Sequence, residues 1–182
     1  MRMVLVLGLL LSACSVLPVP IDLLPYLGPN RSGTQSFQVP SGDYAFEGMK
    51  LPDGEGYPAD FTQANVPVRI GYASLEWALD AALQGPQVAG TLTAQLYLAP
   101  YDAQDPFRPE YRLGDPVTVE VVTGRTVSLS GSATLNAAQL SALNAKRLRL
   151  GVEVSGRMSV ERGGTLTLSY TVTRAVLKVG LF

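Results

Sequence analysis

The side chains best suited to chemistry lie together in one long stretch that lacks strand-like alternation, Ala99 to Pro116. Aromatic and charged residues are interspersed there, and loops of this length are often functional. A sugar needs a flat apolar ring to pack on and planar polar groups to bond with. The stretch therefore predicts a glycan-binding surface, formed by Tyr101, Asp102, Asp105 and Tyr111. The alternative interpretation is that the rings hold the loop on the fold while the charges face water.

Pairs of carboxylates suggest two other chemistries. Asp102 with Asp105, or Asp53 with Glu55, has the side chains for the acid and base of a glycoside hydrolase. Carboxylate oxygens also suit Ca²⁺, but the segment from Asp53 to Gly56 does not have the spacing of an EF-hand loop. Because the chain has 15 acidic residues, such pairs arise by chance. We therefore expect no catalytic residue, no metal and no other cofactor.

The chain contains no histidine, which excludes several common designs. A Ser-His-Asp relay, a Cys-His pair and an imidazole-based zinc or copper site all need that side chain. No glycine-rich nucleotide loop is present, and no basic run with interleaved aromatic residues indicates nucleic acid. The sequence therefore predicts a protein that is not an enzyme, with a carboxylate-based hydrolase as a minor alternative.

An export signal occupies the first residues. Arg2 precedes an apolar run from Val4 to Leu11. This run is too short to span a bilayer, which needs roughly 20 apolar residues, but is typical of a signal peptide. The next residues, Leu-Ser-Ala-Cys ending at Cys14, resemble the lipobox of bacterial lipoproteins. The resemblance implies cleavage before Cys14, the only cysteine in the chain, and attachment of lipid to its sulfur.

The same resemblance implies a location in the cell envelope. In lipoproteins an aspartate directly after the lipidated cysteine tends to retain the protein at the inner membrane. Ser15 stands at that position here. We therefore expect the outer membrane, where the organism has one.

Residues 15–34 are rich in proline and are expected to form an extended tether. Several apolar residues between Ile21 and Leu27 leave a second interpretation open, in which the segment packs on the domain or lies in the lipid interface. The expected organisation is a signal peptide over 1–13, the lipidated cysteine and tether over 14–34, and a single domain over 35–182.

Most of the remaining chain alternates apolar and polar residues with a period of two, which predicts strands with one buried face. The alternating runs are Ser36–Val39, Val66–Tyr72, Leu75–Leu83, Thr91–Leu98, Val117–Val121, Val127–Leu129, Arg147–Val154, Met158–Val160, Thr165–Thr173 and Ala175–Leu181.

Other local patterns refine this prediction. A change of phase near Ala73 predicts a β-bulge, and the pair at Gly163 predicts a hairpin turn. Asn136 to Lys146 predicts a short helix across one end of the sheets, capped by Asn136. Ser41 to Asn65 is expected to be irregular, and Trp77 is expected in the core.

About nine or ten strands with one short helix predict an all-β fold, an antiparallel β-sandwich, with a closed β-barrel as the alternative. Apolar content of 47% and charged content of 16% support a folded body.

These patterns together predict a membrane-anchored envelope lipoprotein, a non-enzymatic structural or assembly subunit that acts through protein contacts. The alternatives are a module that binds a glycan or cell-wall ligand and the hydrolase. The expected partners are membrane lipid at Cys14 and an envelope protein, with a glycan as the alternative.

Overall fold

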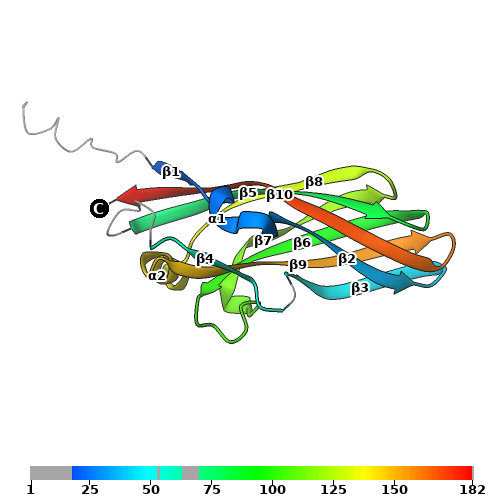
Figure 1. Ribbon diagram of the computed structural model, residues 1–182, viewed down its shortest axis with the longest axis horizontal. Helices are drawn as coiled ribbons and strands as arrows, with labels where there is room; N and C mark the ends of the chain where they lie inside the picture. The colour runs from blue at the N-terminus through cyan, green and yellow to red at the C-terminus, as the bar shows by residue number, and fades with distance from the viewer. Residues whose placement is uncertain (1–17, 53, 63–69, 182) are drawn as a thin grey trace, which may run out of the picture.

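Two antiparallel sheets face each other in the computed structural model, which describes residues 18–52, 54–62 and 70–181 (Figure 1). The helical segments are α1 (Leu24–Leu27), η1 (Gly28–Arg31), η2 (Pro109–Tyr111) and α2 (Ala137–Asn144). The strands are β1 (Val19–Asp22), β2 (Ser32–Val39), β3 (Gly42–Leu51), β4 (Tyr57–Asp60), β5 (Ile70–Gln84), β6 (Val88–Pro100), β7 (Arg112–Val122), β8 (Thr126–Thr134), β9 (Arg147–Val160) and β10 (Gly164–Leu181).

The strand order confirms the predicted sandwich. In the first sheet, sheet A, the order is β1-β10-β5-β8, and β2 pairs with the other half of the β10 edge. In sheet B the order is β3-β9-β6-β7, and β4 also pairs with β9. Each sheet ends in edge strands instead of returning to its first strand, so the closed-barrel alternative is wrong. Apart from the short strands β1 and β4, each sheet has four strands, and the chain passes from one sheet to the other as in a jelly roll.

Most turns at one end of the sandwich carry the chain from one sheet to the other. The connections β2–β3, β5–β6, β7–β8 and β9–β10 all do so, at the end opposite α2 (Figure 1). The hairpin predicted at Gly163 is therefore wrong, because β9 and β10 lie in different sheets. A glycine turn allows the chain to reverse, but it does not decide whether the two strands pair or stack.

The predicted changes of phase correspond to irregularities in the pairing of β5 with β10. Tyr72 pairs with Gly180 and Ile70 with Leu181, which leaves Gly71 as the extra residue. The bulge thus lies two residues before the position predicted near Ala73. A second shift, between Val172 and Arg174, lies where the predicted run Thr165–Thr173 ends and the run Ala175–Leu181 begins. Residues 63–69, with the first part of the predicted Val66–Tyr72 run, lie outside the described residues.

The irregular stretch expected from Ser41 to Asn65 is wrong over β3 and β4. Both strands pair with β9. The register of β3 shifts between Phe46 and Met49, and Gly48 has a φ of +71°. This interruption breaks the alternation that would otherwise have marked the strand.

The expectation that prolines keep residues 15–34 free of helix and strand is wrong from β1 onward. β1 pairs with the end of β10, and Leu23 and Leu27 are buried in the core. Pro20 lies in an edge strand and Pro25 in the first turn of α1, which are the positions that tolerate proline. The second interpretation, in which the segment packs on the domain, holds here. Cys14 lies outside the described residues.

The helix predicted at Asn136 is confirmed as α2, which lies across one end of the sandwich (Figure 1). The Asn136 side chain accepts a hydrogen bond from the Gln139 backbone, and the Gln139 side chain accepts one from the Asn136 backbone. This reciprocal arrangement is a capping box. No helix in the described part of the chain is both long and apolar enough to cross a membrane.

Candidate functional site

The loop between β6 and β7 contains the residues that the sequence singled out. Its Tyr101 ring is half-buried beneath two cations: the guanidinium carbon of Arg147 lies 4.0 Å from the ring centroid and that of Arg149 5.5 Å. The Arg149 Nε also donates a 2.8 Å hydrogen bond to the Tyr101 carbonyl. Such cation–π contacts occupy a face that a sugar would use, so Tyr101 holds the loop on β9.

Asp105 has a comparable structural role. Its Oδ1 accepts a 3.0 Å hydrogen bond from the Phe107 amide and lies 3.6 Å from the Lys50 ammonium. The backbone hydrogen bond from Phe107 lowers the pKa of the Asp105 carboxyl, and the Lys50 charge lowers it further. The bond closes a turn that places the buried Phe107 ring against Tyr97, with ring centroids 5.3 Å apart.

The four predicted ligand-binding residues do not converge. Asp102 is exposed, and Tyr111 is half-buried at the end of the loop. In the described part of the chain, no hydrogen bond, ion pair or ring contact joins any two of Tyr101, Asp102, Asp105 and Tyr111. The arrangement favours the interpretation that the rings hold the loop on the fold, and the glycan surface stays a prediction.

Gln139, which the sequence did not single out, fixes the far end of the loop. Its side chain is 1% exposed. Its Nε2 donates to the carbonyl of Tyr111 at 3.2 Å and to that of Arg112 at 3.0 Å. The sequence pattern of a helix cap predicts the hydrogen bonds at the start of the helix. It does not predict that the same side chain also bonds to a loop that is distant in sequence. The capping box at Asn136 was the one signal that could have found it.

A second polar contact lies beside the loop. The Tyr97 hydroxyl donates a 2.6 Å hydrogen bond to Glu153 Oε2 and accepts one of 3.4 Å from Arg112 Nε. Burial raises the pKa of Tyr97, and the hydrogen bond to Glu153 raises it further. The phenol is therefore a fixed donor rather than a base, and its bonds join three strands of sheet B.

In the part of the chain that the structure describes, every carboxyl group with a shifted pKa has that pKa lowered. Hydrogen bonds from Thr62 lower the pKa of Asp60, and bonds from Lys178 and Arg174 lower that of Glu76. A glycoside hydrolase needs one carboxyl whose pKa is raised, so that it holds a proton for the leaving group. Among the described residues, no group of three metal-ligating side chains is placed to hold an ion. Asp53 lies outside those residues.

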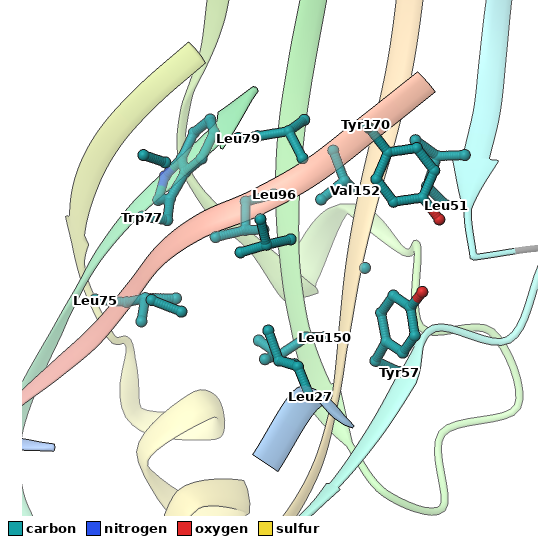
Figure 2. A pocket seen from close by; sticks show the side chains of 14 residues that line it. Leu27, Leu51, Tyr57, Leu75, Trp77, Leu79, Leu96, Leu150, Val152 and Tyr170 are labelled. Carbon is teal, nitrogen blue, oxygen red and sulfur yellow. The ribbon is translucent and has the colours of Figure 1, made fainter. Parts of the chain in front are cut away.

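An apolar cavity of about 50 Å³ lies between the two sheets. Figure 2 shows the Tyr57 and Tyr170 rings along one of its sides and Leu75 and Trp77 along the other, with Leu27 of α1 between the two sides. Burial raises the pKa of Tyr57, and the neighbouring Tyr170 hydroxyl raises it further. A dry apolar cavity of ~150 Å³ admits benzene, so this one is too small for a sugar or a nucleotide. It was missed because Leu27 and Tyr57 fall in segments expected to lack structure.

Several aromatic rings lie over glycines of a neighbouring strand. Trp77, which is 7% exposed as a core residue should be, pairs with Gly131, and Tyr170 pairs with Gly33. A Cβ added at Gly33 would lie 2.6 Å from the Tyr170 hydroxyl oxygen, and one at Gly131 would lie 3.0 Å from the indole nitrogen. These rings fill space that glycine leaves open, so they stabilise the sheets and offer no ligand surface.

β8 is the outer strand of sheet A, and β7 of sheet B lies alongside it: a Cβ added at Gly114 would lie 2.8 Å from the Ala133 Cβ. The strand reads Thr-Val-Ser-Leu-Ser-Gly-Ser-Ala-Thr and contains no charge and no proline. Natural edge strands usually carry such groups, or bulges, against unwanted pairing. On the neighbouring edge of sheet B, β7 has Gly114 with a φ of +68°, followed by Asp115 and Pro116. β7 covers the outer side of β8, so this strand does not offer a free edge to another chain.

Comparison with known proteins assigns neither a family nor a function. No family model matches the chain, and no curated protein matches it. Among solved structures, the chain is similar to that of the infectious bursal disease virus Gx strain, at 13% identity and a TM-score of 0.38, over 90% of this chain and 32% of that one. The chain is also similar to that of a human norovirus GI.7 Houston strain particle, at 11% identity and a TM-score of 0.27. This match covers 94% of this chain and 36% of that one. The chain thus spans about a third of the length of these proteins.

Proposed function

We propose that the protein is a membrane-anchored, non-enzymatic structural or assembly subunit of the cell envelope that acts through protein contacts. The observation that carries this proposal is the lipobox-like sequence Leu-Ser-Ala-Cys ending at Cys14, in a chain that contains no histidine. The polar and aromatic groups of the β6–β7 loop are held in contacts within the chain, as are Glu76 and Tyr97. These groups therefore stabilise the fold, and the proposal assigns them no catalytic role.

The anchor would keep the sandwich close to the membrane. β1 begins five residues after Cys14, and five fully extended residues reach at most about 18 Å. β1 is itself paired with β10, so it adds no reach. Lipid on Cys14 would therefore hold the end of the sandwich that carries β1 within about 20 Å of the lipid headgroups. Confinement to a surface raises the effective concentration of any partner anchored there.

Co-purification tests the proposal. The full chain, tagged at its C-terminus, is expressed in its native envelope, crosslinked briefly and extracted with mild detergent. We expect a protein in fixed proportion, which can be a second copy of the chain. Cys14→Ala, which removes the site of lipid attachment, should reduce its yield. Ser15→Ala, at the next position, is the matched control. Recovery of the uncrosslinked chain alone would contradict the proposal.

A further inference from the structure

The large apolar side chains that remain exposed are not spread evenly over the molecule. Among the described residues there are four: Val19 is 42% exposed, Tyr26 38%, Tyr72 49% and Val122 38%. The first three, which we call the end patch, lie at the end of the sandwich that carries α2. Val122 is the last residue of β7 and lies at the opposite end, where the chain turns into β8.

The sheet pairing brings two members of the end patch together. Val19 of β1 pairs with Val179 of β10, and Tyr72 of β5 pairs with the next residue, Gly180. The three strands are neighbours in sheet A, in the order β1-β10-β5. Adjacent strands lie about 4.8 Å apart, so Val19 and Tyr72 are separated by only the width of one strand.

Tyr26 joins the patch from α1. Its ring meets the buried Phe61 ring edge-on, with the two centroids 5.0 Å apart. The Phe61 amide donates a 2.8 Å hydrogen bond to the carbonyl of Lys146, just after α2. Figure 1 shows β1, α1 and α2 at this end of the sandwich. The fold thus holds the Tyr26 ring in place on one side while part of it stays in contact with water.

The end patch is also where the chain runs toward the proposed lipid. Only three residues, 15–17, separate Cys14 from Pro18, and β1 begins at Val19. The sequence from Ser15 to Ile21 contains no charged residue. Apolar side chains beside a lipid anchor are placed to enter the membrane interface, and a second contact of this kind adds to the hold of the lipid.

We propose that the end patch rests in the headgroup region of the bilayer, so that the sandwich contacts the membrane directly and does not hang free from its anchor. This inference rests on the proposed function and deepens it by naming the surface that meets the lipid. Tyrosine suits this place, because it has an apolar ring and a polar hydroxyl and is enriched at membrane interfaces. The headgroup region is roughly 5–8 Å deep on each side of the bilayer.

The opposite end of the sandwich has a different character. β10 runs from one end to the other in 18 residues, which span about 60 Å. That length is many times the depth of the headgroup region, so the two ends cannot both lie in it unless the sandwich lies flat. The turns at the far end carry the exposed charges of Arg125, Glu161 and Arg162. An upright sandwich would keep these charges in water.

Charged groups beside the end patch already have partners within the chain. Lys178, which pairs with Pro20 of β1, bonds to the Glu76 carboxylate. The Asp22 carboxylate accepts a 3.0 Å hydrogen bond from the amide of Leu24. A charge with a partner costs less to bring toward a region of low polarity than an isolated one.

Quenching by labelled lipid tests the inference. The full chain, made in bacteria and extracted with mild detergent, is placed in vesicles of phosphatidylethanolamine and phosphatidylglycerol. Some of these lipids carry a nitroxide just below the headgroup. A maleimide fluorophore is attached to Val19→Cys, Tyr26→Cys or Tyr72→Cys, and to Val122→Cys as the matched control, because Val122 is also exposed and apolar. The sulfur of a lipidated Cys14 is a thioether and does not react with maleimide.

We expect the nitroxide to quench most of the emission from residues 19, 26 and 72 and to leave that from residue 122 unchanged. A second set of variants tests the cause. Adding Tyr26→Asp and Tyr72→Asp to the chain labelled at residue 19 should reduce the quenching there, because carboxylates favour water over the interface. Adding Val122→Asp should leave it unaltered.

Equal quenching at residues 19, 26, 72 and 122 would overturn the inference. An emission shift to shorter wavelength at the end patch without quenching would also overturn it, because it would indicate that a second copy of the chain covers the patch. The parent chain separates these results from a failure of the anchor. If the parent floats with the vesicles and takes up no fluorophore, Cys14 carries lipid and only the inference is wrong. If it takes up the fluorophore and does not float, the proposed anchor is wrong as well.

Discussion

Replacing Gln139 by glutamate should make the stability of the protein depend on pH in a new way. The parent side chain donates through Nε2 to two carbonyl oxygens, those of Tyr111 and Arg112, and is almost fully buried. In Gln139→Glu an oxygen replaces that nitrogen. An ionised carboxylate would face two acceptors without a donor, whereas a protonated one can still donate to one of them.

The size of the effect follows from linkage. Burial and the two carbonyl dipoles should raise the folded pKa of the new carboxyl, whereas its unfolded pKa is about 4.3. A group whose folded pKa is raised loses stability as pH rises above the unfolded value. If the folded carboxyl stays protonated up to pH 7, the loss between pH 4.3 and 7 reaches about 3.7 kcal/mol, at ~1.36 kcal/mol per pH unit. Below pH 4.3 only the loss of one hydrogen bond remains, about 1 kcal/mol.

Urea unfolding of the full chain in mild detergent, followed by the fluorescence of its single tryptophan, measures this loss. The difference between Gln139→Glu and the parent should grow with pH from about 4.5 to 7. Taking that difference at each pH removes the contributions of the protein's own carboxyl groups. Gln84→Glu, at the exposed end of β5, is the control and should show no such trend. A difference that does not change with pH would refute the reasoning.

Three further outcomes are expected. Leu27→Ala should lower the free energy of unfolding by about 2–4 kcal/mol, measured with urea, because it enlarges the apolar cavity that α1 covers. At pH 7, Glu76→Gln should lower the midpoint temperature of thermal unfolding. At a pH below the folded pKa of Glu76, the same change should leave that temperature unaltered. Lys178 and Arg174 lower that pKa, so the carboxylate stabilises the fold above about pH 4.3 and loses this effect as pH falls. Cys14→Ala should move the protein from the membrane to the soluble fraction on sedimentation, whereas Ser15→Ala should leave it bound.

The sequence predicted the sandwich because alternation reports directly on which side of a strand is buried. The run from Leu75 to Leu83 is buried at every second residue, as predicted. Alternation fails where the backbone is irregular, as at Gly48 in β3. It also cannot distinguish strands that pair from strands that face each other, which is why the turn at Gly163 was misassigned.

The candidate sites were harder to predict for a different reason. The loop residues were found by their chemical type, but the partners that occupy them are distant in sequence. Arg147 and Arg149 on β9 cover Tyr101, and Gln139 on α2 bonds the far end of the same loop. No local pattern reports such contacts.

The passage of the chain between sheets at one end also sets how the protein must fold. Among the described strands, only β6 and β7 are consecutive in sequence and paired with each other. Every other pair joins distant parts of the chain, and β10, the last strand, pairs with β1, β2 and β5. Topologies rich in non-local pairs fold slowly. Sheet A cannot assemble until the C-terminus has been delivered, so a chain exported as proposed would remain unfolded throughout its translocation.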